Sequence, residues 1–171
     1  GITSFGRVDP GGLVEASGSL YLFVNPFVLD PTNENRMFCA GGNHLYFHPN
    51  VSQIPGGSQT PTNLGWSRVT KVPVESGLIS AVEVSLDGKR VYFGSGGGEL
   101  FRIDNTSNPP YFEVSELESL TNGYVSSVAV NPADPEHIIV IFSSYNVPAV
   151  FESKDGGETF VNVSGNLEEN P

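Results

Sequence analysis

Residues 126–153, SSVAVNPADPEHIIVIFSSYNVPAVFES, carry the pattern that decides the fold. An alternating apolar run comes first, a turn of Asn, Pro and Asp follows, and a second apolar run ends in a Ser-rich turn. A third short apolar run closes the segment. Val, Ile and Phe in alternation, bounded by turn formers, indicate short strands rather than helices. The stretch therefore predicts three antiparallel strands joined by two turns.

The same order of runs and turns occurs twice upstream. It is found in residues 25–49, NPFVLDPTNENRMFCAGGNHLYFHP, and in residues 80–104, SAVEVSLDGKRVYFGSGGGELFRID. Asp30 precedes the matching Ser85 by 55 residues, and Ser85 precedes the matching Asn131 by 46. A repeat of about 40–50 residues with four strands per copy is the signature of a β-propeller blade.

A fourth, outer strand is expected in each copy. The three candidates are residues 66–72, 111–117 and 159–165. The sequence thus predicts an all-β chain, a β-propeller portion of about three four-stranded antiparallel blades. The blades are expected at about residues 20–75, 76–120 and 121–167 of a single propeller segment spanning residues 1–171. One short helix, of a turn or two, is expected at residues 115–120.

Composition excludes several classes of partner. A net charge of −11 makes nucleic acid and anionic membranes poor partners. No apolar stretch is long enough to span a membrane, and no signal peptide is visible. The single cysteine, Cys39, excludes an internal disulfide, and its apolar surroundings favour a small buried residue over a reactive thiol. The absence of an initiating Met indicates a piece of a larger polypeptide.

A short motif directly follows the third copy, in residues 153–160, SKDGGETF. An Asp in a tight turn, here Asp155, can accept hydrogen bonds from backbone N–H groups just ahead of it, and the glycines allow positive φ. Ser153 and Thr159 can close the mouth of the hairpin by side-chain hydrogen bonds. Phe160 is expected to turn inward between neighbouring sheets. The motif therefore predicts a structural role for the hairpin rather than catalysis.

The order Ser153, Asp155, Gly157, Thr159, Phe160 resembles the Asp-box, or BNR repeat, with Phe160 where Trp is usual. The resemblance extends over residues 20–167 and is to secreted propellers, which include xyloglucanase-like glycoside hydrolases and sortilin-like receptors. It implies an extracellular or cell-surface protein. The first two copies lack the box, and Asp104 is its one remnant there.

Three carboxylates are weak catalytic candidates: Asp30, Asp87 and Asp134. Each lies in the turn after the first strand of its copy, so the three would decorate equivalent ends of the blades. Glycoside hydrolysis requires two facing carboxyl groups, which makes such a rim suggestive. Asp is also a favoured turn residue, and that structural interpretation is preferred. Glu99 is expected to be an exposed edge carboxylate.

Sialidases share the Asp-box but require an arginine cluster and a Tyr nucleophile with a Glu. The arginines are scattered along the sequence, at Arg7, Arg36, Arg68, Arg90 and Arg102, and no Phe-Arg-Ile-Pro segment stands near the start. A sialidase is therefore disfavoured.

The sequence indicates no metal or cofactor. The glycine-rich residues 94–99, GSGGGE, lack the phosphate-loop pattern and join two strands. His44, His48 and His137 lack the spacing of metal ligands. The nucleophile motif GxSxG is absent.

These observations predict a non-catalytic extracellular scaffold or binding module for glycan or protein. The alternative is part of a glycoside hydrolase of the xyloglucanase-like type, with its acid or base outside these residues. Three blades would leave two apolar faces open, which soluble monomers seldom tolerate. The expected partners are therefore the remaining blades of a parent chain or a second copy in a homodimer.

Overall fold

The protein is described here by a computed structural model, which describes residues 10, 21–55, 63–69, 74–107, 109 and 112–167. Twelve strands lie in this part of the chain. Those of the first sheet are β1 Phe27–Asp30, β2 Asn33–Gly41, β3 His44–His48 and β4 Ser67–Arg68. Those of the second are β5 Ile79–Val84, β6 Arg90–Ser95, β7 Leu100–Asp104 and β8 Glu113–Glu116. Those of the third are β9 Val125–Asn131, β10 Asp134–Phe142, β11 Val150–Ser153 and β12 Val161–Asn162.

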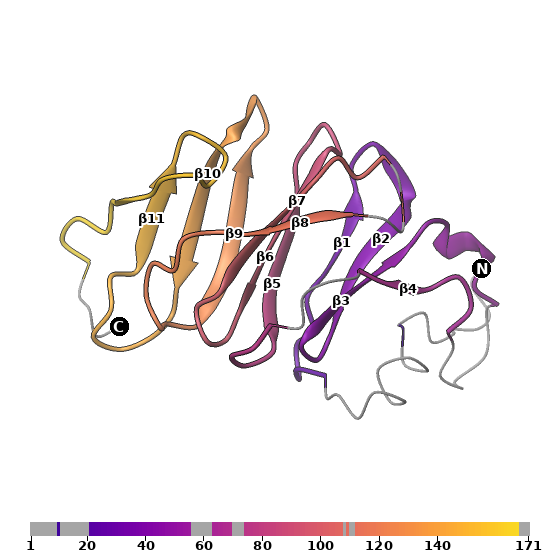
Figure 1. Ribbon diagram of the computed structural model, residues 1–171, viewed down its shortest axis with the longest axis horizontal. Coiled ribbons are helices and arrows are strands. Elements are labelled where there is room, and N and C mark those ends of the chain that lie inside the picture. Colours follow the sequence, from indigo (N-terminus) through magenta and orange to yellow (C-terminus); the bar gives the residue numbers. More distant parts are fainter. Residues whose placement is uncertain are drawn as a thin grey trace, which may run out of the picture.

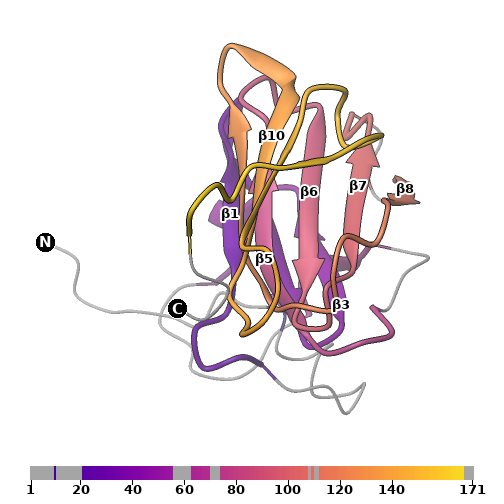
Figure 2. The ribbon, with the colours of Figure 1, turned by 90° about the vertical axis from the view of Figure 1, so that its left-hand side faces the viewer.

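Each sheet is a four-stranded antiparallel meander, with its strands side by side in chain order. Figure 1 shows the three sheets next to one another, with the first sheet on the right and the third on the left. In Figure 2 the strands of the second sheet run in order from β5 on the left to β8 on the right. The first strands of neighbouring sheets, β1, β5 and β9, are in contact. The predicted all-β fold of three four-stranded blades is confirmed.

Two details differ from the sequence prediction. The expected helix at residues 115–120 is wrong: β8 extends to Glu116, and residues 117–120 are irregular. The short helical element that the structure does contain is a 3₁₀ turn, η1, at Val51–Gln53. Its N-cap is Asn50, whose side chain accepts a hydrogen bond from the backbone N–H of Ser52. The predicted fourth strand at residues 159–165 is shorter than expected, because β12 pairs with only part of β11. Residues 70–72 and 111 of the other two predicted strands lie outside the described residues.

Apolar side chains fill both seams between the sheets. Along β2, Phe38 and Ala40 face the second sheet and join a cluster that contains Val91 and Phe93 of β6. A second cluster joins Tyr92 of that same strand to the third sheet. Since side chains alternate along a strand, β6 contributes to both seams. The second sheet is therefore covered on both faces.

The face of the first sheet that points away from the second sheet has a smaller cluster. Met37 and Cys39 of β2 pack there with Tyr46, Ile54 and Trp66. Cys39 is buried, as the sequence predicts. No helix in the described residues is long and apolar enough to cross a membrane.

Candidate functional site

The hairpin after β11 is held by hydrogen bonds among its own residues. The Ser153 hydroxyl donates to Oδ1 of Asp155 over 2.8 Å and accepts from the backbone N–H of Gly157 over 2.8 Å. The carboxylate of Asp155 also accepts from the backbone N–H of Thr159 over 2.9 Å and from its hydroxyl over 2.6 Å. These hydrogen bonds, above all that from the Thr159 hydroxyl, lower the pKa of Asp155 to about 2.

The backbone of this hairpin depends on its two glycines. Gly156 and Gly157 have φ of 71° and 93°, which disfavours residues with a Cβ. A Cβ on Gly156 would also lie 2.5 Å from Oε2 of Glu136 and 2.9 Å from Nη1 of Arg90. Phe160, which follows the hairpin, is half-buried and packs on the cluster between the second and third sheets.

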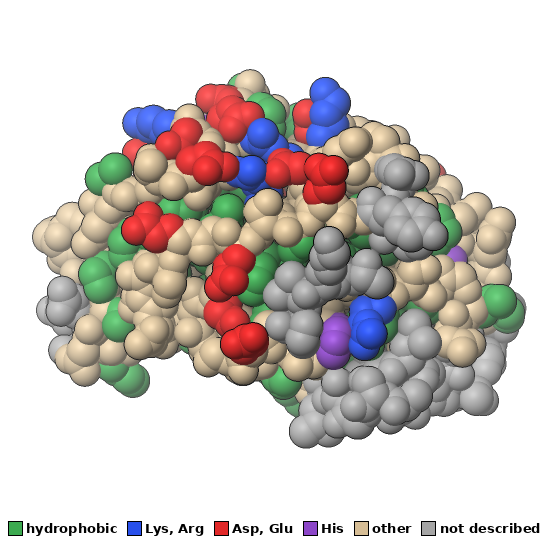
Figure 3. Space-filling view, viewed as in Figure 1, with side chains coloured by type: hydrophobic (Ala, Val, Ile, Leu, Met, Phe, Trp, Pro, Cys, Tyr) green, Lys and Arg blue, Asp and Glu red, His purple; other side chains and the backbone are tan. Residues whose placement is uncertain are grey.

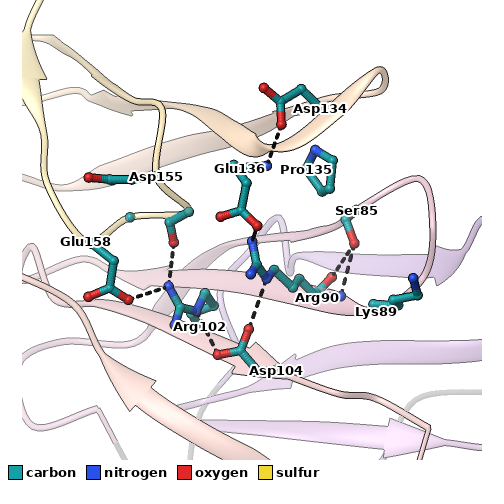
Figure 4. Close-up of polar contacts among 12 residues, drawn as sticks. Ser85, Lys89, Arg90, Arg102, Asp104, Asp134, Pro135, Glu136, Asp155 and Glu158 are labelled. Atoms are coloured by element: carbon teal, nitrogen blue, oxygen red, sulfur yellow. Dashed lines mark hydrogen bonds and ion pairs between the residues drawn. The ribbon is translucent and has the colours of Figure 1, made fainter.

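The hairpin docks on two arginines of the second sheet (Figure 4). Nη1 of Arg102 donates to the carbonyl oxygen of Gly156 over 2.8 Å and to Oε1 of Glu158 over 3.0 Å. Nη1 of Arg90 lies 2.6 Å from Oε1 of Glu136, in β10. Asp104 bridges the two arginines, 3.0 Å from Nε of Arg90 and 2.8 Å from Nε of Arg102. We call these five side chains, Arg90, Arg102, Asp104, Glu136 and Glu158, the arginine clasp.

Acidic and basic side chains gather along the upper edge of the molecule (Figure 3). Arg90 and Arg102 are separated along the sequence, but the antiparallel pairing of β6 and β7 brings them together. The interpretation of these two arginines as scattered is therefore wrong. Their guanidinium groups are paired with carboxylates, so they are not free to hold a sugar carboxylate. Arg68 lies 3.3 Å from the ring of His44, and Arg7 lies outside the described residues.

The three rim carboxylates are engaged in their own turns. Asp30 is buried, accepts from the backbone N–H and hydroxyl of Thr32, and lies 2.8 Å from Nη1 of Arg36. Asp87 accepts from the Ser85 hydroxyl, and this hydrogen bond is the main cause that lowers its pKa. Oδ1 of Asp134 accepts from the backbone N–H of Glu136 over 3.1 Å.

Glu99 has a role that the sequence did not suggest. Its carboxylate accepts hydrogen bonds from the backbone N–H groups of Glu75 and Ser76, each over 2.9 Å, and from the Ser95 hydroxyl over 3.0 Å. It is half-buried rather than an exposed edge group. Glu99 therefore ties the connection between the first and second sheets to the β6–β7 turn.

The histidines lie apart and have separate partners. The ring of His48 accepts from the backbone N–H of Asn50 and lies 3.0 Å from the carbonyl oxygen of Leu64. Nε2 of His137 lies 2.8 Å from Oε1 of Glu152. Within the described ranges, no group of three His, Cys, Asp or Glu residues could hold a metal ion.

Glu83 is a candidate that sequence reasoning missed. It lines a hollow of about 280 Å³ at the ends of the three innermost strands. The other lining residues are Val28, Leu29, Pro31, Val84, Leu86, Val130 and Pro132. Burial raises the pKa of Glu83, and its carboxyl has no hydrogen-bond or ion-pair partner in the described part of the chain. The available signal was a lone carboxyl within the apolar strand AVEV at residues 81–84.

Comparisons with known proteins bear on the fold. No family model matches the chain, and no curated protein does. Among solved structures, a xyloglucanase of family GH74 from Xanthomonas campestris is similar with a TM-score of 0.57 at 15% identity, over 83% of this chain and 23% of that one. The β-propeller domain of Cps50 (Swd1) from Myceliophteria thermophila is similar with a TM-score of 0.54 at 6% identity. That match covers 80% of this chain and 37% of the other.

The fold is that of a β-propeller segment. Hydrazine synthase from Kuenenia stuttgartiensis is a further match, with a TM-score of 0.58 at 15% identity, over 80% of this chain and 34% of that one. The chain thus spans between 23% and 37% of the length of these three proteins. At such low identity, the matches establish the fold alone.

Proposed function

We propose that this propeller segment is a non-catalytic binding module for glycan or protein in an extracellular or cell-surface protein. The proposal rests on the observation that the three rim carboxylates are engaged in hydrogen bonds within their own turns. Asp30, Asp87 and Asp134 each hold their own turn. Glycoside hydrolysis requires two carboxyl groups roughly 5–9.5 Å apart across the scissile bond. Glu83 is the single carboxyl among the described residues that line its hollow.

The ligand is proposed to bind over the Glu83 hollow. Its walls are Val, Leu and Pro side chains, and one carboxylate lies among them. Apolar walls with a few fixed polar groups are typical of ligand sites, because burial supplies affinity and the polar group orients the ligand. A carboxylate can accept hydrogen bonds from sugar hydroxyls or from a peptide amine. Five of the eight lining residues lie in the paired strands β1, β5 and β9, which position the backbone around Glu83 before a ligand binds.

The proposal is tested by calorimetric titration with xyloglucan oligosaccharides and with a panel of other glycans and peptides. Glu83→Gln is expected to weaken binding, while Glu113→Gln, on the exposed β8, serves as the matched control. Because burial raises the pKa of Glu83, the charged form destabilises the fold at neutral pH. The Gln variant should therefore melt no lower than the native chain, so lost binding would not reflect unfolding. Binding that both variants leave unchanged would exclude this hollow.

A second function is part of a glycoside hydrolase of the xyloglucanase-like type. The likeness to the GH74 xyloglucanase and the raised pKa of Glu83, as a general acid requires, favour it. Its partner carboxylate would then come from outside the described residues. Release of reducing sugar from xyloglucan, abolished by Glu83→Gln, would support the enzyme. Binding without turnover would support the binding module.

We further propose that other blades complete the ring, from the rest of a parent chain or from a second copy. The matched solved chains are much longer than this one. Both outermost sheets also expose large apolar side chains, among them Phe27 of β1 and Ile141 of β10. Ring closure would cover these faces, since sheet edges and apolar faces are otherwise sites of association.

A further inference from the structure

Strand register defines equivalent positions in the three sheets. Met37 pairs with Leu29, Val91 with Val84, and Ile138 with Val130, in each case just before the turn between the first two strands. The residues that precede these three are Arg36, Arg90 and His137. By the alternation of side chains, all three are on the face that points toward the following sheet.

The two seams between neighbouring sheets are bridged by the same kind of hydrogen bond. Nη2 of Arg36 donates to the carbonyl oxygen of Thr106 over 2.8 Å, from the first sheet to the second. Nη1 of Arg102 donates to the carbonyl oxygen of Gly156 over 2.8 Å, from the second sheet to the third. Thr106 lies three residues after the residue that pairs with Val91, and Gly156 lies three residues after the residue that pairs with Ile138. Thr106 and Gly156 are therefore equivalent. A cation of one sheet thus binds the outer hairpin of the next sheet.

The outward face of the third sheet has the same positions, and the charge is inverted at two of the three. His137 stands where the second sheet has Arg90, Glu152 where it has Arg102, and Lys154 where it has Asp104. Glu152 lies 2.8 Å from Nε2 of His137 and 3.3 Å from Nζ of Lys154. A hairpin with the carboxylates of the clasp would be repelled by Glu152. This face therefore requires a neighbour with neutral donors.

The first sheet offers such donors on its outward face. Asn35 stands where the third sheet has Glu136, two residues before the paired position. Gln53, in η1, lies five residues after its paired residue, the same sequence offset as Glu158. Both are amides, which can donate to a carboxylate and accept from Lys or His. The polar ends of the two outermost faces are therefore complementary in chemistry.

The apolar parts of these two faces also match. On the first sheet, Phe27 and Leu29 are 62% and 44% exposed beside a hollow of about 570 Å³. On the third sheet, Ile141 and Val161 are 38% and 63% exposed. Each face thus combines an apolar area with the polar ends described above, as the two internal seams do.

We propose that the outward face of the third sheet binds the outward face of the first sheet in a second copy of this chain. Two such contacts, related by a two-fold axis, give a closed ring of six sheets. A closed arrangement leaves neither face exposed, whereas a contact between two third sheets would place the acidic Glu152 face of one copy against the same face of the other and leave the first sheets uncovered. The proposal rests on the proposed completion of the ring and names the partner that completes it.

The test is the mass of the purified 171-residue chain by light scattering and sedimentation over a wide range of concentration. A species of twice 18.3 kDa is expected. Ile141→Asp should shift it to monomer, because a charge would enter the apolar contact. Gln53→Glu should raise the dimer dissociation constant about tenfold, since it opposes Glu152. The double variant Gln53→Glu with Glu152→Arg should restore the dimer by recreating the Arg102–Glu158 pair.

Three outcomes overturn the proposal. These are a folded monomer of the native chain at every concentration, a dimer that Ile141→Asp and Gln53→Glu both leave intact, and species larger than the dimer. Circular dichroism melting checks that each variant is folded, and Glu113→Gln is the neutral control. A monomer that binds ligand at the Glu83 hollow would leave the binding module standing without the dimer. A dimer that binds no ligand at this hollow would support the dimer and contradict the binding module.

Discussion

At the scale of single residues, the polar side chains of this chain mainly stabilise nearby backbone through hydrogen bonds. Asp155, Asp30 and Asp87 each accept hydrogen bonds from groups within four residues. Glu83 differs, since its carboxyl faces a hollow and has no partner among the described residues. The contrast separates carboxylates that organise turns from the one that is available to a ligand.

The stability supplied by Asp155 should depend on pH. Its pKa is lowered from 3.8 to about 2, so its contribution is fully present above pH 4 and is lost as pH falls toward 2. Asp155→Ala is expected to lower the Tm by about 3–6 °C at pH 7, because the hairpin donors lose their acceptor. Differential scanning calorimetry at pH 7 and pH 2 checks this. A Tm difference that persists undiminished at pH 2 would contradict the charged role.

At the scale of the element, the hairpin of residues 153–159 is both closed by its own hydrogen bonds and docked on the second sheet. Its own hydrogen bonds aim the carbonyl oxygen of Gly156 at Arg102. The hydroxyl of Tyr92 lies 3.4 Å from the same oxygen. The local motif therefore prepares a surface that binds the neighbouring sheet.

Substitutions at two glycines, one on each side of β12, distinguish the cost of backbone strain from the cost of steric crowding. Gly156 and Gly165 have similar φ, 71° and 62°, but only Gly156 has side-chain atoms within 3 Å of a Cβ position. Gly165→Ala should cost about 1 kcal/mol of unfolding free energy, from backbone strain alone. Gly156→Ala should cost about 2–4 kcal/mol, because Glu136 and Arg90 must also move. Urea unfolding of both variants measures the difference, and equal losses would show that the clasp does not press on Gly156.

The clasp itself should contribute to stability more than an exposed ion pair does. Arg102→Ala leaves Glu158 without its cation, removes one of the two cations of Asp104 and removes a donor from the carbonyl of Gly156, with an expected loss of about 1–3 kcal/mol. Lys89→Ala is the matched control, because Lys89 pairs with Asp87 at the exposed surface. Its expected effect is below about 0.5 kcal/mol. Urea denaturation at low salt tests the pair, and equal small effects would refute a stabilising clasp.

At the scale of the whole molecule, the second sheet couples the other two. Val91 and Phe93 face the first sheet, while Tyr92 and Leu100 face the third. Because one sheet contributes to both clusters, the loss of one seam should weaken the other. The three sheets are therefore expected to unfold as one cooperative unit.

Trp66, the single tryptophan, permits a test of this coupling. It lies with the first sheet, while Phe142 lies in the cluster between the second and third sheets. Phe142→Ala is expected to cost about 3–5 kcal/mol. If unfolding is cooperative, the midpoint by Trp66 fluorescence should fall as far as that by circular dichroism. A fluorescence midpoint that stays at the native value would show that the sheets unfold independently.

The sequence by itself determined the strands, their order and the repeat of four per sheet. These features follow from side-chain alternation and turn residues, which act over a few positions, as in AVEV of β5 or DGG of the hairpin. The bonds within the hairpin from Ser153 to Thr159 are local for the same reason. The helix expected at residues 115–120 failed because pairing of β8 with β7 overrides a weak local preference.

Tertiary structure alone decided which side chains meet across the seams. Arg102 and Gly156 are 54 residues apart in sequence, and Arg36 and Thr106 are 70 apart. The Glu83 hollow likewise requires the ends of three strands from three repeats. Strand patterns specify the face on which a side chain lies, but not what the next sheet places against it. That depends on how neighbouring sheets pack, and the packing brings distant residues within hydrogen-bonding distance.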